Sequence, residues 1–286
     1  MKNIKIITDA SCDLPKEVID KYDINVVNID VSFDEEVFTC GLEVEESIKL
    51  DNDTFYEKMG NMSDLPKTAC PSPERFMKAY DTEEENVLVF TLTSKLSATY
   101  STAVLAKDMF LEENPKKNIV IIDSETGTVG TTQLIIKAFE MIEEGKTVDE
   151  IVVEIEKAKN ELVFYGTLDT LENTIKGGRI SPLKGGIINA LNFKAIIHIT
   201  EGVVKPIDKA RGEVKSLKKV IEYINNNVED ATNKRVIIAH GNCYDKALKV
   251  KALVEEGRNY KEVLIAEIGP VMGTYTAKGA ILVAVL

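Results

Sequence analysis

Residues 87–103 read VLVFTLTSKLSATYSTA, a continuous apolar run that turns into a segment rich in hydroxyl groups. The apolar run predicts a buried strand of a parallel sheet, and the apolar spacing of residues 98–110 predicts a helix. Ser94, Ser97 and Thr99 therefore lie where a strand ends and a helix begins. In a parallel sheet this turn is at the carboxyl edge, where α/β proteins bind ligands and where helix-start N–H groups attract anions. Ser97 has a second interpretation, as a simple N-cap of the helix.

The first half of the chain repeats this pattern. Further short apolar runs occur at residues 4–7, 24–31 and 118–124, and helical patterns follow at residues 16–22, 51–62 and 131–144. Residues 32–47, between the second run and its helix, are interpreted as a β-extension or a loop. Strands that alternate with helices indicate an α/β fold with a parallel sheet and helices on its faces. Polar residues end three of the strands, at 8–9, 91–97 and 123–124, and these ends predict a crevice along one edge of the sheet.

The second half combines a predicted hairpin around Gly202 with crossover helices, which indicates a mixed sheet. We therefore expect an N-terminal domain over residues 1–160 and a C-terminal domain over residues 161–286. The segment around residues 61–80 is expected to pack with the second domain. Residues 67–73, with two prolines, are interpreted as a constrained turn, and the glycine-rich residues 269–279 as a loop.

Composition excludes several classes of function. The chain has 286 residues, 44% of them hydrophobic, and its net charge of −12 argues against binding to nucleic acid or to an anionic membrane. No apolar run is long enough to span a membrane and the N-terminus has no signal-peptide pattern, so we expect a cytoplasmic protein. The four cysteines form no CxxC pair and there are only two histidines, which argues against a metal site.

Few residues have the spacing that catalysis needs. The GxGxxG, GxxxxGK[ST] and GxSxG motifs are absent, so residues 269–279 only loosely resemble a phosphate-binding loop. Hydroxyls at Thr68, Ser97 and Thr276, without acid–base partners, favour a binding site for a carboxylate. Arg179 and Arg211 can bind an anion, dock a partner or pair with acidic residues.

Five stretches resemble the conserved motifs of one family. Residues 8–15 (TDASCDLP) resemble TDSSxDLP, residues 67–73 (KTACPSP) resemble TSQPSP, and residues 93–100 (TSKLSATY) resemble SSxLSGTY. Residues 171–181 (LENTIKGGRIS) resemble LxxLxxGGRIS, and residues 269–279 (GPVMGTYTAKG) resemble GPVIGTHTGPG. These motifs occur in the order found in the DegV family, and together they identify the chain as similar to its members.

The resemblance implies a two-domain α/β fold with a Rossmann-like N-terminal domain, a parallel sheet and a mixed-sheet C-terminal domain. It also implies a long-chain fatty acid held between the domains and no other cofactor. Some members are the non-catalytic, acyl-carrying subunit of a bacterial fatty acid kinase, whose ATP-binding partner phosphorylates the carboxylate. No nucleic-acid partner and no stable membrane insertion are expected.

Residue roles follow from the matched motifs. The carboxylate is expected to contact Thr68, Ser97, the N–H of Ala98 and Tyr275. Further cleft or partner contacts are expected from Ser94, Thr274, Thr276, Arg179 and Arg211. Candidate tunnel walls, each with simple core packing as the alternative, are Ile187, Ile188, Leu191, Phe193, Phe164 and Ile268.

Three departures from the family motifs bear on the expected carboxylate site. Tyr275 replaces a histidine, Ala98 replaces a glycine, and Ala69 and Cys70 replace a Ser-Gln pair. A phenol can still donate a hydrogen bond, and Ala98 keeps its N–H group. Two other functions stay open: a transferase or hydrolase that acts on a small phosphorylated or carboxylated substrate in the same cleft, and a partner-binding scaffold whose cleft is empty.

Overall fold

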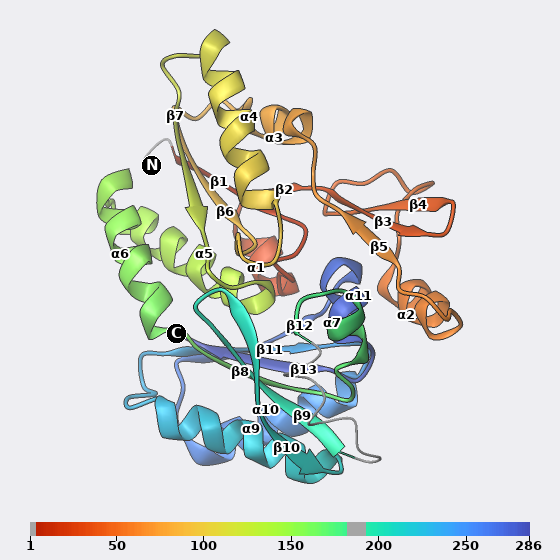
Figure 1. The fold of residues 1–286 in the computed structure, drawn as a ribbon. Coiled ribbons are helices and arrows are strands. Elements are labelled where there is room, and N and C mark those ends of the chain that lie inside the picture. The colour runs from red at the N-terminus through yellow and green to blue at the C-terminus, as the bar shows by residue number, and fades with distance from the viewer. Residues whose placement is uncertain (1–3, 182–192) are drawn as a thin grey trace.

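The structure of the chain is a computed structural model that describes residues 4–181 and 193–286. Their strands form a four-stranded, a six-stranded and a three-stranded sheet (Figure 1). The α/β class that the sequence predicts, with one parallel and one mixed sheet, is confirmed.

The four-stranded sheet is parallel, in the order β2-β1-β6-β7. Its strands are β1 (Ile4–Asp9), β2 (Ile24–Val27), β6 (Asn86–Thr91) and β7 (Asn118–Asp123). The helices of this half are α1 (Lys16–Lys21), α3 (Pro73–Tyr80), α4 (Thr99–Glu113), α5 (Thr128–Glu143) and α6 (Val148–Glu161). Ile6 and Ile7 of β1 belong to different core clusters, and both are fully buried. Burial of both faces explains why the strands are continuously apolar.

The predicted strand-to-helix transition in residues 87–103 is confirmed by β6 and α4. The first helical residue is Thr99, so Ala98 and not Ser97 occupies the cap position. Ser97 still contributes, because its hydroxyl oxygen accepts a hydrogen bond of 3.3 Å from the N–H of Thr99.

The six-stranded sheet is mixed, in the order β10-β9-β8-β13-β11-β12. Its strands are β8 (Val163–Leu168), β9 (Phe193–Thr200), β10 (Val203–Arg211), β11 (Arg235–His240), β12 (Glu262–Glu267) and β13 (Ile281–Val285). Only β11 and β12 pair in parallel. Helices α9 (Glu213–Asn227) and α10 (Tyr244–Gly257) cover one face of this sheet (Figure 1). The short helices α7 (Glu172–Lys176) and α11 (Pro270–Thr276) follow the ends of β8 and β12.

Helix α5 lies between the two larger sheets and packs against both. Leu134 and Ile135 share one core cluster with Leu88 of β6 and Leu282 of β13. The last strand of the parallel sheet ends at residue 123 and the first strand of the mixed sheet begins at residue 163. The domain boundary near residue 160 stays a prediction.

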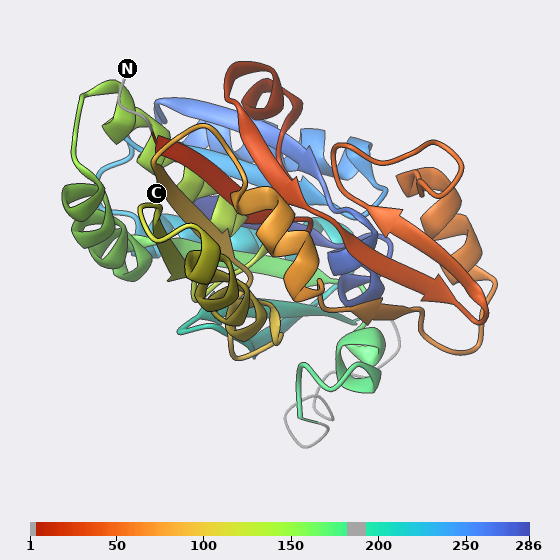
Figure 2. The ribbon, with the colours of Figure 1, turned by 90° about the horizontal axis from the view of Figure 1, so that it is seen from above.

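A small antiparallel sheet, β4-β3-β5, projects beside the larger sheets (Figures 1 and 2). It consists of β3 (Ile29–Phe33), β4 (Glu36–Cys40) and β5 (Lys67–Ala69), with helix α2 (Asn52–Gly60) beneath. The prediction of a simple turn over residues 67–73 was therefore wrong at its start, since Thr68 pairs with Val31. This pairing joins residues that are far apart in sequence, so no local pattern could indicate it.

The glycine-rich loop predicted at residues 269–279 was also wrong, because residues 270–276 form α11. Pro270 suits the first helical turn. A Cβ built at Gly273 would lie 2.7 Å from both the ring of Phe55 and the hydroxyl of Tyr56, so this glycine lets α11 pack closely on α2. Within residues 4–181 and 193–286, no helix has both the length and the apolar character needed to cross a membrane.

Candidate functional site

A cavity of about 380 Å³ lies at the carboxyl edge of the parallel sheet and reaches the mixed sheet. Most of its wall is apolar, including Leu92, Leu96, Ile197, Ile199, Met272 and Leu282. Ile197 and Leu282 are almost fully buried, whereas Ala69, Cys70 and Ala98 are exposed. The inner end is therefore apolar, and the hydroxyl-bearing β6–α4 turn borders the side that is open to solvent.

The turn at the start of α4 is held by carboxylates from neighbouring strands. Asp9 at the end of β1 accepts a hydrogen bond of 2.8 Å from the N–H of Leu92, and Asp123 at the end of β7 accepts one of 3.2 Å from the N–H of Ser94. Burial raises the pKa of Asp9, although hydrogen bonds from Ser11 and Leu92 oppose this effect. The polar strand ends seen in the sequence therefore position the β6–α4 turn.

The turn presents a pair of hydroxyls to the cavity. Ser97 Oγ lies 2.8 Å from Thr99 Oγ1, and both residues line the wall. The cap residue Ala98 makes no side-chain capping hydrogen bond, Ser97 Oγ accepts one of 3.3 Å from the N–H of Thr99, and the first turn of α4 contains no acidic residue. Its exposed N–H groups and helix dipole make this end of the cavity suitable for an anion.

Tyr275 on α11 faces this turn from the other side of the cavity. Its hydroxyl lies 2.7 Å from Thr68 Oγ1 of β5, and its carbonyl accepts a hydrogen bond of 2.8 Å from Thr174 Oγ1. The guanidinium of Arg179 lies 4.3 Å from the centre of the tyrosine ring, within the range of a cation–π contact. The start of α11 is fixed by Asp13, whose carboxylate accepts a hydrogen bond of 2.8 Å from the N–H of Gly269.

Six of the predicted site residues line this one cavity. They are Thr68, Ser97, Ala98, Arg179, Tyr275 and Thr276. Thr276 also donates a hydrogen bond of 3.1 Å to the carbonyl of Met272. The structure thus brings together residues that are more than two hundred positions apart in the sequence.

The other three predicted residues do not line this cavity. Ser94 is exposed next to Asp123, and the hydroxyl of buried Thr274 donates to the carbonyl of Pro270. Arg211 is exposed at the end of β10. Their roles stay predictions.

The six residues expected to form the tunnel wall fall into three groups. Ile187, Ile188 and Leu191 lie outside the described residues. Phe164 and Ile268 are fully buried in the main core and do not line the cavity. Phe164 faces α5 instead, where a Cβ built on Gly130 would lie 3.0 Å from its ring. Phe193 also lies outside the lining, with Lys209 Nζ 5.3 Å from its ring centre.

Sequence reasoning missed the apolar residues that do form the wall. Ile197 and Ile199 alternate along β9 and so share one face of the strand. That period-two pattern was a usable signal, but only the sheet order reveals which face meets the cavity.

The chemistry of the wall favours binding. In the part of the chain that the structure describes, no cluster of His, Cys, Asp and Glu could hold a metal ion. The polar end of the cavity offers hydroxyl donors, helix N–H groups and one guanidinium, which suit an anionic head group. The apolar remainder of the cavity wall suits an apolar tail.

Comparisons with known proteins extend over the whole chain. A sequence model described as "Uncharacterised protein, DegV family" matches residues 3–286. A fatty acid-binding protein of Thermotoga maritima is 29% identical, with 97% of this chain and 96% of the relative covered. A DegV family protein from Ruminococcus gnavus, refined with vaccenic acid, has a similar structure, with a TM-score of 0.90, 29% identity and 100% of both chains covered. The fatty acid kinase (Fak) B3 protein of Streptococcus pneumoniae, loaded with linoleic acid, is similar at a TM-score of 0.85 and 25% identity, with 99% of each chain covered.

Proposed function

The chain belongs to the DegV family, and from this premise we propose that it binds a long-chain fatty acid in the cavity between its two larger sheets. The observation that supports this most directly is the wall itself. An apolar interior built around Ile197 and Leu282 ends at the hydroxyls of Thr68, Ser97 and Tyr275. A fatty acid matches this arrangement, because its apolar tail ends in a polar carboxylate.

The apolar tail supplies most of the affinity in this proposal. Burying one methylene gives about 0.8 kcal/mol, so about fifteen methylenes give on the order of 12 kcal/mol before ordering costs are subtracted. A hydrogen bond to a charged group contributes about 1.5–3 kcal/mol. The hydroxyls therefore mainly orient the carboxylate.

In this proposal the carboxylate contacts four groups. We assign it to the hydroxyls of Thr68, Ser97 and Tyr275 and to the N–H of Ala98. Because Ala69, Cys70 and Ala98 are exposed, this end of the cavity remains accessible to a second protein.

We infer that this second protein is an ATP-binding kinase subunit, which phosphorylates the carboxylate while this chain only carries the acid. The similarity to a protein named as a fatty acid kinase component supports this assignment. The exposed Arg211 is available as a docking contact for such a partner.

Ser97→Ala tests the carboxylate site directly. Loss of one hydrogen bond to a charged acceptor should weaken binding of a long-chain fatty acid by roughly tenfold, because about 1.4 kcal/mol corresponds to a factor of ten. Ser101→Ala is the matched control, since Ser101 is an exposed residue of α4 outside the cavity wall, and it should bind like the wild type.

The measurement is native mass spectrometry of the freshly purified protein, followed by equilibrium binding of oleate. Wild-type protein should carry a fatty acid, and the Ser97 variant should retain less of it. A wild-type protein that carries no lipid and binds no oleate would refute the proposed function.

A further inference from the structure

The mixed sheet forms one side of the cavity, and its strand order shows how far the cavity reaches. Val204 of β10, Ile197 and Ile199 of β9, Leu168 of β8 and Leu282 of β13 all line the wall. These four strands are consecutive in the order β10-β9-β8-β13-β11-β12. Strands β11 and β12, both described over their full length, contribute no residue to the wall. Leu282 is therefore the last lining residue across the sheet.

The opposite end of this row of strands lies beside the β6–α4 turn. Thr93 Oγ1 donates a hydrogen bond of 3.1 Å to the carbonyl of Gly202 at the tip of the β9–β10 hairpin. Lys95 Nζ donates one of 2.7 Å to the carbonyl of Glu201. Ser97, to which we assign the carboxylate, follows in the same turn. A bound acid thus has its head group on the β10 side of the sheet, and its tail points across the sheet toward β13.

The core behind Leu282 is closed. Ala239 of β11 pairs with Leu282 and is fully buried. Ala284, the next residue of β13 on the same face, pairs with Phe164 of β8, and both are fully buried. All three belong to the main core cluster and none of them lines the cavity. A tail that passed Leu282 would meet closely packed side chains.

Leu282 lies over a neighbour that has no side chain. Gly166 of β8 pairs with Leu282 on one side and with Ile197 on the other. A Cβ built on Gly166 would lie 2.6 Å from Leu282 Cδ2 and 3.4 Å from Ile197 Cγ1, so the leucine side chain fills the space above the glycine. The same Cβ would lie 2.8 Å from the carbonyl oxygen of Ile281. Because any side chain at Gly166 would disturb the sheet backbone, a test has to change Leu282 instead.

We propose that Leu282, lying over Gly166, is the specificity-determining residue that sets the longest acyl chain the cavity accepts. The inference rests on the proposed function and adds a limit to its class of ligand. Each methylene up to this stop should raise the affinity by about fourfold, because it leaves water for an apolar wall. A methylene beyond the stop has to displace Leu282 or stay in water, so the affinity should no longer rise.

Two substitutions move the stop in opposite directions. Leu282→Ala removes the volume of about three carbon atoms above the glycine, so the chain length of maximal affinity should increase by about three carbons. Leu282→Phe adds a similar volume, so this length should decrease by about two carbons or more. Leu264→Ala is the matched control, because Leu264 of β12 is a buried leucine of the same core cluster that does not line the cavity.

The measurement is displacement of cis-parinaric acid, a fluorescent fatty acid, from the delipidated full-length protein. The competitors are unbranched saturated fatty acids of about twelve to about twenty carbons, a range centred near the tail length considered above. The wild type and Leu264→Ala should reach maximal affinity at the same chain length. Thermal unfolding of each variant confirms that it is folded, and if Leu282→Ala does not fold, Leu282→Phe decides the test.

The proposal is overturned if both Leu282 variants keep the wild-type maximum, or if Leu264→Ala shifts it as far as Leu282→Ala does. It is also overturned if Leu282→Phe favours longer chains, or if the wild-type affinity rises through the longest acid. A wild type that binds no fatty acid of any length refutes the proposed function. A wild type that binds fatty acids, with a maximum that the Leu282 variants leave in place, refutes only this inference.

Discussion

Ala277, the residue directly after α11, has a backbone conformation that is almost reserved for glycine. Its φ of +63° and ψ of 172° place the Cβ against the backbone, at a cost of about 1–3 kcal/mol. Its N–H still donates 2.9 Å to the carbonyl of Gly273, which closes the helix two residues beyond Tyr275. The family motif that residues 269–279 resemble has glycine here, so this chain carries strain next to its candidate site.

Ala277→Gly should therefore stabilise the protein by about 1 kcal/mol. Relief of the strain outweighs the roughly 0.4–1 kcal/mol that greater freedom of the unfolded chain costs. Urea unfolding followed by far-UV circular dichroism measures the change. Ala252→Gly in the exposed face of α10 is the control and should lose about 1 kcal/mol. Equal losses for both variants would contradict the strain at Ala277.

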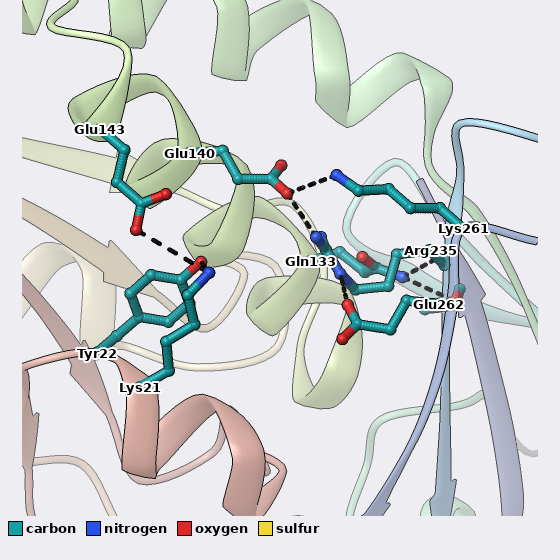
Figure 3. A network of polar contacts seen from close by, with 9 residues as sticks. Lys21, Tyr22, Gln133, Glu140, Glu143, Arg235, Lys261 and Glu262 are labelled. Carbon is teal, nitrogen blue, oxygen red and sulfur yellow. Dashed lines mark hydrogen bonds and ion pairs between the residues drawn. The ribbon is translucent and has the colours of Figure 1, made fainter.

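At the scale of elements, α5 connects the cavity to a polar network on its far side (Figure 3). Thr128 at its start lines the cavity. Further along, Gln133 donates to the carbonyls of Arg235 and Ala284 at 2.8 and 3.0 Å. Glu140 accepts hydrogen bonds from Arg235 at 2.6 Å and Lys261 at 2.9 Å. The helix that begins at the cavity is thus anchored to the mixed sheet.

Glu140→Gln should destabilise the protein by about 1–2 kcal/mol at neutral pH, because charge-assisted hydrogen bonds to a largely buried arginine are lost. Burial opposes ionisation of Glu140, but Lys261 and Arg235 outweigh it and lower its pKa. A lowered carboxylate pKa stabilises the fold above the unfolded value, near pH 4, and this gain is lost as the pH falls through the folded value.

The stability difference between wild type and Glu140→Gln should therefore shrink below about pH 4, as measured by denaturant unfolding at several pH values. Glu143→Gln on the next turn is the control. Its 3.9 Å contact with Lys21 joins two exposed side chains, so its loss should change stability by less than about 0.5 kcal/mol. A difference for Glu140→Gln that persists in acid would contradict this role.

Elements were predictable from the sequence wherever their pattern was local. The apolar run of β6 and the helical spacing of α4 predict both elements and the turn between them. Helix α11 was missed because its close fit on α2 depends on Gly273, which local propensity penalises. Strand β5 was missed because three residues gain their structure only from pairing with distant β3.

The candidate site was partly predictable for the same reason. Thr68, Ser97, Ala98 and Tyr275 lie in motifs that resemble those of a family, and the structure places all four on one cavity. The apolar wall residues were not predictable from the sequence. An apolar strand residue that faces a cavity has the same sequence pattern as one that packs against a helix. Phe164 illustrates this, because it is fully buried next to Gly130 of α5 and does not line the cavity.

At the scale of the whole molecule, an occupied cavity should stabilise all three sheets together. Ile29 of the small sheet, Leu92 after the parallel sheet and Leu282 of the mixed sheet all contact the same space. Ligand at a hundred times its dissociation constant stabilises the folded state by about 2.7 kcal/mol. For a protein of this size, that corresponds to a rise in Tm of roughly 5 °C.

Delipidated protein should therefore melt about 5 °C higher with oleate than without it, in one cooperative transition by differential scanning calorimetry. Butyrate, with the same head group and almost no tail, is the control and should leave the Tm unchanged. An equal shift with both acids would contradict the assignment of affinity to the tail.

The cavity wall uses residues from Ile29 to Leu282, so its first and last members are synthesised far apart in time. A nascent polypeptide that has not yet released β13 and α11 from the ribosome lacks both Leu282 and Tyr275. The proposed fatty acid can therefore occupy the complete cavity only after translation of these residues. Until then, the apolar residues of the incomplete wall lack their partners and are exposed to aggregation.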